Sequence, residues 1–412
     1  MDVLLTDDEV MVQQAAAEFL TQEATTVLAR QAERDPARIS RELWAKVAAL
    51  GWLGVCLPEA VGGQGLPLTY LGLLCEEVGR HIAPLPLLST MIPALILAQH
   101  GSPTQRALLR EVIAGDRLLT FAVQEPNCRW SLDAVALAGK IEGDTLILTG
   151  EKSFVDNPHS AAQCLVVFRM LDGSGLALAL VDMDAAGISF EDLITTAGDA
   201  QATMRFDGLR VPTADIVGTP ATGRAIAHEL MDLAAALTTA LMVGASSGAT
   251  HRAVEYAKQR HAFGQPIAAF QAIQHMAADM TIGVDGAQML VREALWRLSH
   301  DLPASVEVSQ AKAFANEKCL MAVRSAQQIH GGIGFIAEFD QQLWYRRVVA
   351  WTLRCGTAPE HRARVAAALL DRPGKVRLGY DMVLDDAKGD LPIRQDAGQV
   401  RAVASDDAAA AS

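Results

Sequence analysis

The residues from Arg260 to Met280 combine side chains that suit a phosphate-rich ligand with the start of a helix. The guanidinium of Arg260 offers a planar set of donors that matches a phosphate or pyrophosphate. Gly264 lets a ligand approach the backbone, and Pro266 is expected to open the helix that follows. Gln271 presents an amide to a ribose or a base. The same residues also suit a surface loop entering a helix, and the stretch alone leaves both interpretations open.

Regions with different hydrophobic periods surround this stretch and must position it. A capping box at Thr6 and Glu9 starts an apolar helical repeat, whereas short β-branched runs separated by Gly-containing turns follow in the middle of the chain. Helical repeats then return. We expect an α+β multidomain protein with an N-terminal helical domain, a central small antiparallel β-domain, a C-terminal four-helix bundle and a polar tail, at residues 1–117, 118–216, 217–371 and 372–412.

Individual elements follow from the same patterns. Helices are expected at Arg41–Leu50, Leu68–Val78, Thr104–Ala114, Ala225–Gln259 and Ala304–Ile329, with a further helix face from Ile273 to Leu298. Strands are expected at Thr145–Thr149, Cys164–Arg169, Leu176–Val181 and Ala202–Phe206.

Composition excludes several classes of function. The 412 residues carry a net charge of -13, which argues against a nucleic-acid partner and against an anionic membrane surface. The six cysteines are scattered without a C-x-x-C pair, so we expect neither a metal site nor a disulfide framework. The most apolar run, Leu233 to Val243, is too short to span a bilayer, and the acidic N-terminus is no signal peptide. We expect a cytoplasmic protein.

Three stretches, in this order of domains, carry a family resemblance. They are P-E-A-V-G-G-Q-G-L at 58–66, R-H-A-F-G-Q-P-I-A-A-F-Q at 260–271 and Q-I-H-G-G-I-G-F at 328–335. Over roughly residues 5 to 370 the chain resembles the acyl-CoA dehydrogenase family. The resemblance implies FAD bound between two subunits and oxidation of an acyl-CoA thioester to the 2-enoyl-CoA. In that reaction a glutamate removes the α-proton, a hydride passes from the β-carbon to the flavin, and an electron-transfer flavoprotein is the implied acceptor.

The resemblance also assigns residues that this chain would contribute to a neighbour's cofactor. The arginine and phenylalanine of the R-x-x-F-G motif hold the pyrophosphate and adenosine end of FAD in the adjacent subunit. The implied FAD-binding residues of this chain are Arg260, Phe263, Gln271, Gln328, Gly331, Gly332 and Thr357.

The chain's own half of the site departs from the family pattern. The first flavin loop begins as Gln124–Glu125–Pro126 but continues as Asn127–Trp130, without the glycines and serine that receive phosphate oxygens. The family's W-I-T beside the flavin ring is replaced by Phe154-Val155-Asp156. A carboxylate at Asp156 would disfavour the anionic reduced flavin.

The catalytic base is also missing. The family's E-G-T aligns with Cys355-Gly356-Thr357, and the alternative base position, on the long helix before the R-x-x-F-G motif, is Ala234, with Ala235 beside it. A catalytic Cys355 would need a lowered thiol pKa, for which only the adjacent Arg354 is available. We therefore assign no catalytic residue and take Cys355 as an inert replacement, with a base role as the alternative.

The remaining polar residues are ambiguous. Asp232 matches a family aspartate that contacts the CoA arm, but a solvated or capping acid fits it equally well, and Glu229 lies on the same helix. Glu360 is expected to be a surface acid. We expect His275 and His330 to be structural, because no cluster of partners accompanies them.

Three hypotheses follow from this pattern of retention and loss. The first is the base-less subunit of an α2β2 acyl-CoA dehydrogenase for bulky, steroid side-chain-like substrates, whose homologous partner carries the glutamate. The second is a homomeric flavoenzyme with an unrecognised base or with oxygen chemistry. The third is a flavin-free scaffold or CoA-ester-binding subunit.

Overall fold

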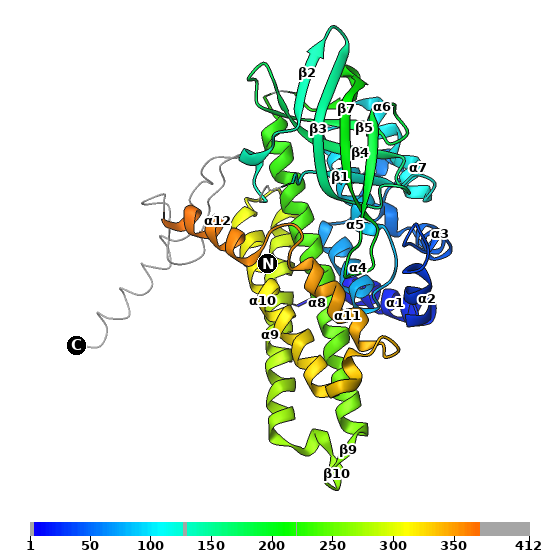
Figure 1. Ribbon diagram of the computed structural model, residues 1–412, viewed down its shortest axis with the longest axis vertical. Helices are drawn as coiled ribbons and strands as arrows, with labels where there is room; N and C mark the ends of the chain where they lie inside the picture. Colours follow the sequence, from blue (N-terminus) through cyan, green and yellow to red (C-terminus); the bar gives the residue numbers. More distant parts are fainter. Residues whose placement is uncertain (1–3, 127–129, 220, 371–412) are drawn as a thin grey trace, which may run out of the picture.

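The computed structural model describes residues 4–126, 130–219 and 221–370. The predicted polar tail from 372 and the altered loop residues 127–129 lie outside the described residues. The β-sheet lies at one end of the three longest helices, and the N-terminal helices pack against the side of these helices (Figure 1). The helices are α1 Asp7–Glu23, α2 Thr26–Ala32, α3 Arg41–Ala49, α4 Leu68–Arg80, α5 Leu87–His100, α6 Pro103–Ala107, α7 Leu109–Ala114, α8 Gly223–Gln259, α9 Gln271–Ser299, α10 Ser305–His330, α11 Gln341–Trp351 and α12 Ala358–Leu370.

The central sheet contains eight strands in the order β6-β7-β3-β2-β4-β5-β8, with β1 paired to β4. Its pairs are antiparallel except β1–β4 and β2–β4, which are parallel. A core of alternating side chains, separate from the helical core, fills one face. The strands are β1 Leu119–Ala122, β2 Ala138–Glu142, β3 Thr145–Asp156, β4 Gln163–Met170, β5 Leu176–Asp182, β6 Ile188–Leu193, β7 Gln201–Pro212 and β8 Ile216–Val217.

Helix α8 is the central element of the helical core. It is rich in small apolar residues and is buried along most of its length, with α4, α9 and α10 packed along it. At Gly244 a Cβ atom would lie 1.7 Å from the carbonyl oxygen of Glu76, so the close approach of α4 requires glycine there. By length and composition α8 could cross a membrane, but 94% of its most apolar window is buried inside the protein, as in the core helix of a globular domain.

The predicted fold class is confirmed, and the predicted elements are present, although several further helices and strands were not predicted. The expected helix at Thr104–Ala114 is divided into α6 and α7, and α5, which carries Pro93 inside it, was not expected. The capping box of Thr6 and Glu9 is present at the start of α1. Helices give way to strands between α7 and β1, and return after β8. The predicted domain boundaries themselves stay predictions.

Candidate functional site

A short hairpin carries the R-x-x-F-G motif at the tip of the long helices, far from the sheet (Figure 1). Strands β9 (His261–Ala262) and β10 (Gln265–Pro266) pair around Phe263 and Gly264. Both turn residues have positive φ, 55° and 83°, as a two-residue type I′ turn requires. The prediction that Pro266 opens the helix is wrong, because Pro266 lies in β10 and α9 begins only at Gln271. A 3-10 turn at Ile267–Ala269 separates them.

The predicted cofactor residues at this end of the molecule are open to solvent. Phe263 is 95% exposed, and Arg260, Gln271 and Gln328 are also exposed. No hydrogen bond or ion pair of the Arg260 guanidinium with another described residue is recorded. A monomer rarely exposes a phenylalanine ring this completely, and the exposed ring beside the Arg260 guanidinium suits contact with a second molecule.

Helix α10 runs back toward the hairpin end and stops at a glycine pair. Gly331 caps it with φ 63°, and a Cβ atom at either Gly331 or Gly332 would meet no atom within 4 Å. This open space is what the close approach of a ligand to the backbone needs. The hairpin and the glycine pair are therefore both open to solvent, as the predicted contact with the adenosine and diphosphate end of FAD requires. The assignment of each residue to FAD stays a prediction.

Both family base positions lie together at the other end of the molecule. Cys355 follows α11 in a tight turn at φ 53°, and its Sγ atom lies 3.5 Å from Oγ1 of Thr238 on α8. Ala234, the alternative position, is buried one helical turn before Thr238. Two positions far apart in the sequence thus face the same place, and neither carries a carboxylate.

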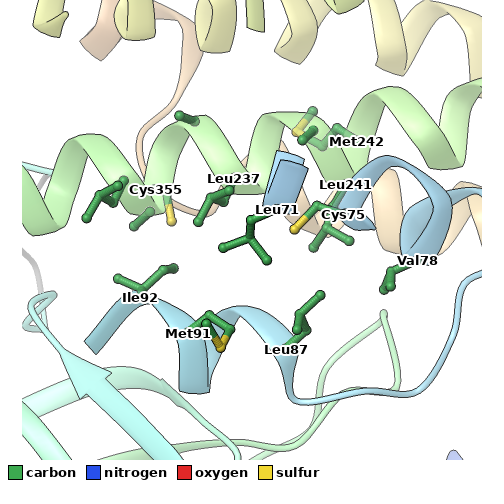
Figure 2. Packing of buried hydrophobic residues seen from close by; sticks show 14 of the residues in the cluster. Leu71, Cys75, Val78, Leu87, Met91, Ile92, Leu237, Leu241, Met242 and Cys355 are labelled. Atoms are coloured by element: carbon green, nitrogen blue, oxygen red, sulfur yellow. The ribbon is translucent and has the colours of Figure 1, made fainter. Parts of the chain in front are cut away.

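Cys355 is part of the apolar core rather than an activated thiol. It is buried in the same cluster as Leu237 of α8 and Met91 and Ile92 of α5 (Figure 2). Burial raises the pKa of the Cys355 thiol, although Arg354 opposes that shift. A thiol held in the protonated form cannot accept a proton, so the geometry favours the interpretation of Cys355 as an inert replacement.

Three buried polar side chains, not identified from the sequence, hold the turn that contains Cys355. Lys312 Nζ donates to the Trp351 carbonyl at 2.8 Å, and Asn316 Nδ2 donates to the Gly356 carbonyl at 3.1 Å. His361 Nε2 donates to the Cys355 carbonyl at 2.8 Å. Burial lowers the pKa of Lys312 to about 8 and that of His361 to about 4. The sequence offered one indication of these contacts, since Lys312 and Asn316 are polar residues one turn apart on a buried helix.

The space beside Cys355, where the resemblance places the flavin ring, is almost closed. The cavity measures about 20 Å³ and is lined by Phe121, Val123, Gln124, Trp130, Ser153, Phe154, Asp156, Arg354 and Cys355. That volume holds roughly one water molecule, whereas pockets for drug-sized ligands measure about 300–1,000 Å³. The residues present at this end do not fit a flavin ring.

An ion pair occupies the wall of this cavity. The Arg354 guanidinium pairs with the Asp156 carboxylate and lies 3.6 Å from the carboxylate of Asp199. Burial raises the pKa of Asp156, and Arg354 opposes this shift. For Arg354, burial alone would lower the pKa, but Asp156 and Asp199 outweigh it and raise the pKa further above its usual range. Asp156 is therefore engaged within the chain.

Glu360 is not the simple surface acid that we expected. It accepts hydrogen bonds from the backbone N–H of Trp130 at 2.8 Å and from the backbone N–H of Thr357 at 2.8 Å. Burial would raise the pKa of Glu360, but these hydrogen bonds outweigh it and lower the pKa. Thr357, one of the predicted FAD-binding residues, donates a hydrogen bond from its hydroxyl to the same carboxylate at 2.7 Å. Glu360 thus joins the altered flavin loop to the turn of Cys355.

The other ambiguous residues have partners within the chain. Asp232 is buried and is paired with Arg364 of α12 at 2.8 Å, so it is not a solvated acid. Glu229 accepts from His100 at 2.8 Å. His330 is structural, as expected: it is buried and its Nδ1 bonds to the Ala326 carbonyl. His275, in contrast, is an exposed residue of α9.

Comparisons with known proteins agree with this arrangement. The family models for the acyl-CoA dehydrogenase N-terminal and C-terminal domains match residues 6–116 and 221–370. A 3-(aryl)acrylate reductase of Clostridium sporogenes is 30% identical over 89% of this chain and all of its own length. A probable acyl-CoA dehydrogenase of Bacillus subtilis, YngJ, is 30% identical over 90% of this chain and all of its own length.

Solved structures extend the likeness to the fold. A variant of the Tcur3481–Tcur3483 steroid ACAD is 33% identical, with a TM-score of 0.80 over 87% of this chain and 97% of that chain. The ChsE4–ChsE5 complex from Mycobacterium tuberculosis is 26% identical, with a TM-score of 0.85 over 91% of this chain and all of that chain. The chain therefore belongs to the acyl-CoA dehydrogenase family, whose members bind FAD.

Proposed function

We propose that this chain is the base-less subunit of a heteromeric acyl-CoA dehydrogenase whose homologous partner supplies the catalytic glutamate and the flavin-ring pocket. One observation carries the proposal: of the two regions that the family uses to bind FAD, one is open to solvent in this chain and the other is nearly filled. The hairpin and glycine edge is open and retains its donors, whereas the space beside Cys355 measures about 20 Å³ and has no base.

Relatives support a heteromer. Two of the similar structures carry names that pair two proteins, and one of these is a steroid ACAD. We infer an α2β2 assembly that acts in the cytoplasm on a bulky acyl-CoA, with steroid side-chain thioesters as the class to test first. An electron-transfer flavoprotein is the proposed acceptor.

The division of labour follows from the chemistry. When bound at the interface, FAD would supply the hydride acceptor for the β-carbon of the thioester, and the partner's glutamate would be the base for the α-proton. This chain supplies Arg260, whose guanidinium balances the negative charge of the diphosphate. Phe263 and the Gly331–Gly332 edge cover the adenosine end. Every contribution of this chain is therefore to binding and orientation.

Purification tests the proposal. The chain alone is expected to be colourless or weakly yellow, and co-expression with a partner that retains the glutamate is expected to give about one FAD per heterodimer. Absorbance at the flavin bands after denaturation measures the stoichiometry, and turnover with an artificial acceptor measures activity. Stoichiometric FAD and full dehydrogenase activity from this chain alone would contradict the proposal and support the homomeric enzyme.

The closed cavity also suits a flavin-free scaffold subunit. In that case this chain would contribute no residue to FAD binding in the complex. Removal of the Arg260 side chain separates the two functions, because a scaffold predicts unchanged FAD content in the complex.

A further inference from the structure

One arginine side chain contacts two carboxylates that line cavities of very different size. The small cavity of about 20 Å³ beside Cys355 is lined by Asp156 and Arg354. A cleft of about 620 Å³ lies between the α2–α3 turn and the β6–β7 segment, and Asp199 lines it. Arg354 pairs with Asp156 on one side and reaches Asp199 at 3.6 Å on the other. Its guanidinium therefore lines the small cavity and reaches the cleft only through the carboxylate of Asp199.

We propose that Arg354 is a plug: held by Asp156 and Asp199, its side chain occupies the position of this chain's own flavin ring and excludes a flavin from this chain. The interpretation of the small cavity beside Cys355 as a flavin-ring position rests on the proposed function. The claim about Arg354 is separate, because it states which side chain closes the space and predicts that removal of this side chain enlarges the small cavity.

Electrostatics make the plug hard to displace. A neutral ring could enter only if the Arg354 side chain left, and the partly buried carboxylate of Asp156 would then lose its cation. Loss of one partner from a buried ion pair is strongly unfavourable, since the remaining charge is neither hydrated nor paired. Asp199 retains two other donors, Thr195 Oγ1 and Gln201 Nε2, so Asp156 is the acid that depends most on Arg354.

The opposite wall of the small cavity is built differently. Trp130 packs against Gly356, where a Cβ atom would lie 3.1 Å from the indole. Its backbone is tied to Glu360. Trp130 is therefore fixed through its backbone, whereas the Arg354 side chain is held by its contacts with Asp156 and Asp199. Arg354 is therefore the residue whose removal tests the proposal.

The plug has a consequence for assembly. Two copies of this chain would offer two open edges but two plugged ring positions, so FAD would find no complete site between them. A ligand that binds only one assembly stabilises it by mass action, and FAD at about 100 times its Kd would favour that assembly by about 100-fold. FAD would thus select the heteromer over a homomer of this chain.

Flavin-ring binding by the isolated full chain tests the plug. The variant Asp156→Ala/Arg354→Ala removes the pair together, so no charge of the pair is left unmatched. Lumiflavin, which is the ring alone, is titrated and its fluorescence quenching is followed. The wild-type chain is expected to give no saturable quenching, and the double variant is expected to bind at least tenfold more tightly. The control Arg30→Ala/Asp340→Ala removes an arginine–aspartate pair of similar exposure elsewhere and is expected to behave as wild type.

Thiol alkylation gives a second readout that does not require flavin. Iodoacetamide labelling mapped to peptides is expected to modify Cys355 at least fivefold faster in the double variant, while Cys164 in the sheet core stays unreactive. If the alanine variant does not fold by circular dichroism, Asp156→Asn/Arg354→Gln keeps the side-chain volumes and removes the charges, and the same increases in lumiflavin binding and Cys355 labelling are expected.

The outcomes separate this inference from the proposed function. Saturable lumiflavin binding to the wild-type chain at the variant's affinity, or a folded variant with neither flavin binding nor faster Cys355 labelling, would overturn the plug. A variant that gains ring binding in a chain that fails to assemble with any glutamate-bearing partner would leave the plug standing and overturn the proposed function.

Discussion

The hairpin edge and the turn of Cys355 come from the same bundle, yet they use their polar groups in opposite ways. At the hairpin, no recorded hydrogen bond or ion pair with another described residue engages the Arg260 guanidinium, and Phe263 projects 95% exposed. At the turn, Lys312, Asn316 and His361 all donate to backbone carbonyls of residues 351–356. The first region is built to bind something outside the chain, and the second is satisfied within it.

This difference teaches how a two-subunit site can be divided. Polar groups that serve a ligand stay unpaired until the ligand arrives, whereas polar groups that are buried without one must find partners in the chain. The turn keeps the strained positive φ of Cys355 although no catalytic group sits there. Lys312, Asn316 and His361 therefore hold the backbone of a turn that carries no carboxylate at position 355 and lies beside the Arg354–Asp156 ion pair.

The largest expected effect lies in the closed region and depends on pH. The pKa of His361 is lowered from 6.5 to about 4 in the folded chain, so between these values the unfolded chain binds a proton that the folded chain does not. Stability should fall as the pH drops through this window, by about 3 kcal/mol at most. His361→Gln keeps a donor for the Cys355 carbonyl and should flatten this dependence in urea midpoints between pH 7 and pH 4.5.

The control for this prediction is His275→Gln, which changes an exposed histidine and should preserve the wild-type slope. Identical slopes for wild type and His361→Gln would show that the turn of Cys355 carries no buried titration, and the contrast between the two regions would lose its electrostatic basis.

The next effect belongs to the open region. In the complex, Arg260→Ala should weaken FAD binding by about 2 kcal/mol, or roughly 30-fold, because charge-assisted hydrogen bonds to the diphosphate are lost. The stability of the lone chain should not change, since the guanidinium is exposed. Equilibrium dialysis of FAD measures the affinity, with Arg110→Ala, an exposed arginine of α7, as the control. Unchanged FAD affinity would favour the scaffold function.

A smaller effect is expected at the tip of the same hairpin. Phe263→Ala should weaken FAD binding or assembly of the complex by about 1 kcal/mol, or roughly fivefold, through lost apolar and stacking contact. The melting temperature of the lone chain should stay within 1 °C or so, because so exposed a ring stabilises the isolated fold very little. A marked loss of stability in the lone chain would mean that the hairpin packs within its own chain.

The smallest effect tests the closed region again. Cys355→Ala in the complex should change turnover by less than about twofold, because burial keeps the thiol protonated and the cavity admits only about a water molecule. Steady-state rates with the acyl-CoA measure this. A loss of tenfold or more with unchanged FAD content would establish Cys355 as a catalytic group and restore the alternative that the sequence left open.

The sequence predicted elements best where local rules act. The capping box at Thr6, the helix expected at residues 304–329 and the long apolar helix α8 all follow from neighbours within a few residues. The helix α5 was missed because Pro93 argues against a helix locally, while burial of its apolar side chains in the core stabilises it there. Pro266 was misplaced for the opposite reason, since a hairpin that depends on pairing precedes the helix.

By itself the sequence determined which side chains are available: an arginine and a phenylalanine kept at 260 and 263, and no carboxylate at 234 or 355. Residue identity suffices for that, because a missing carboxylate cannot be replaced by folding. Only the tertiary structure decided that Arg354 and Asp156, 198 residues apart, close the space beside Cys355. Sequence patterns carry no record of such pairs, because the partner of a buried charge is chosen by the packing of distant elements.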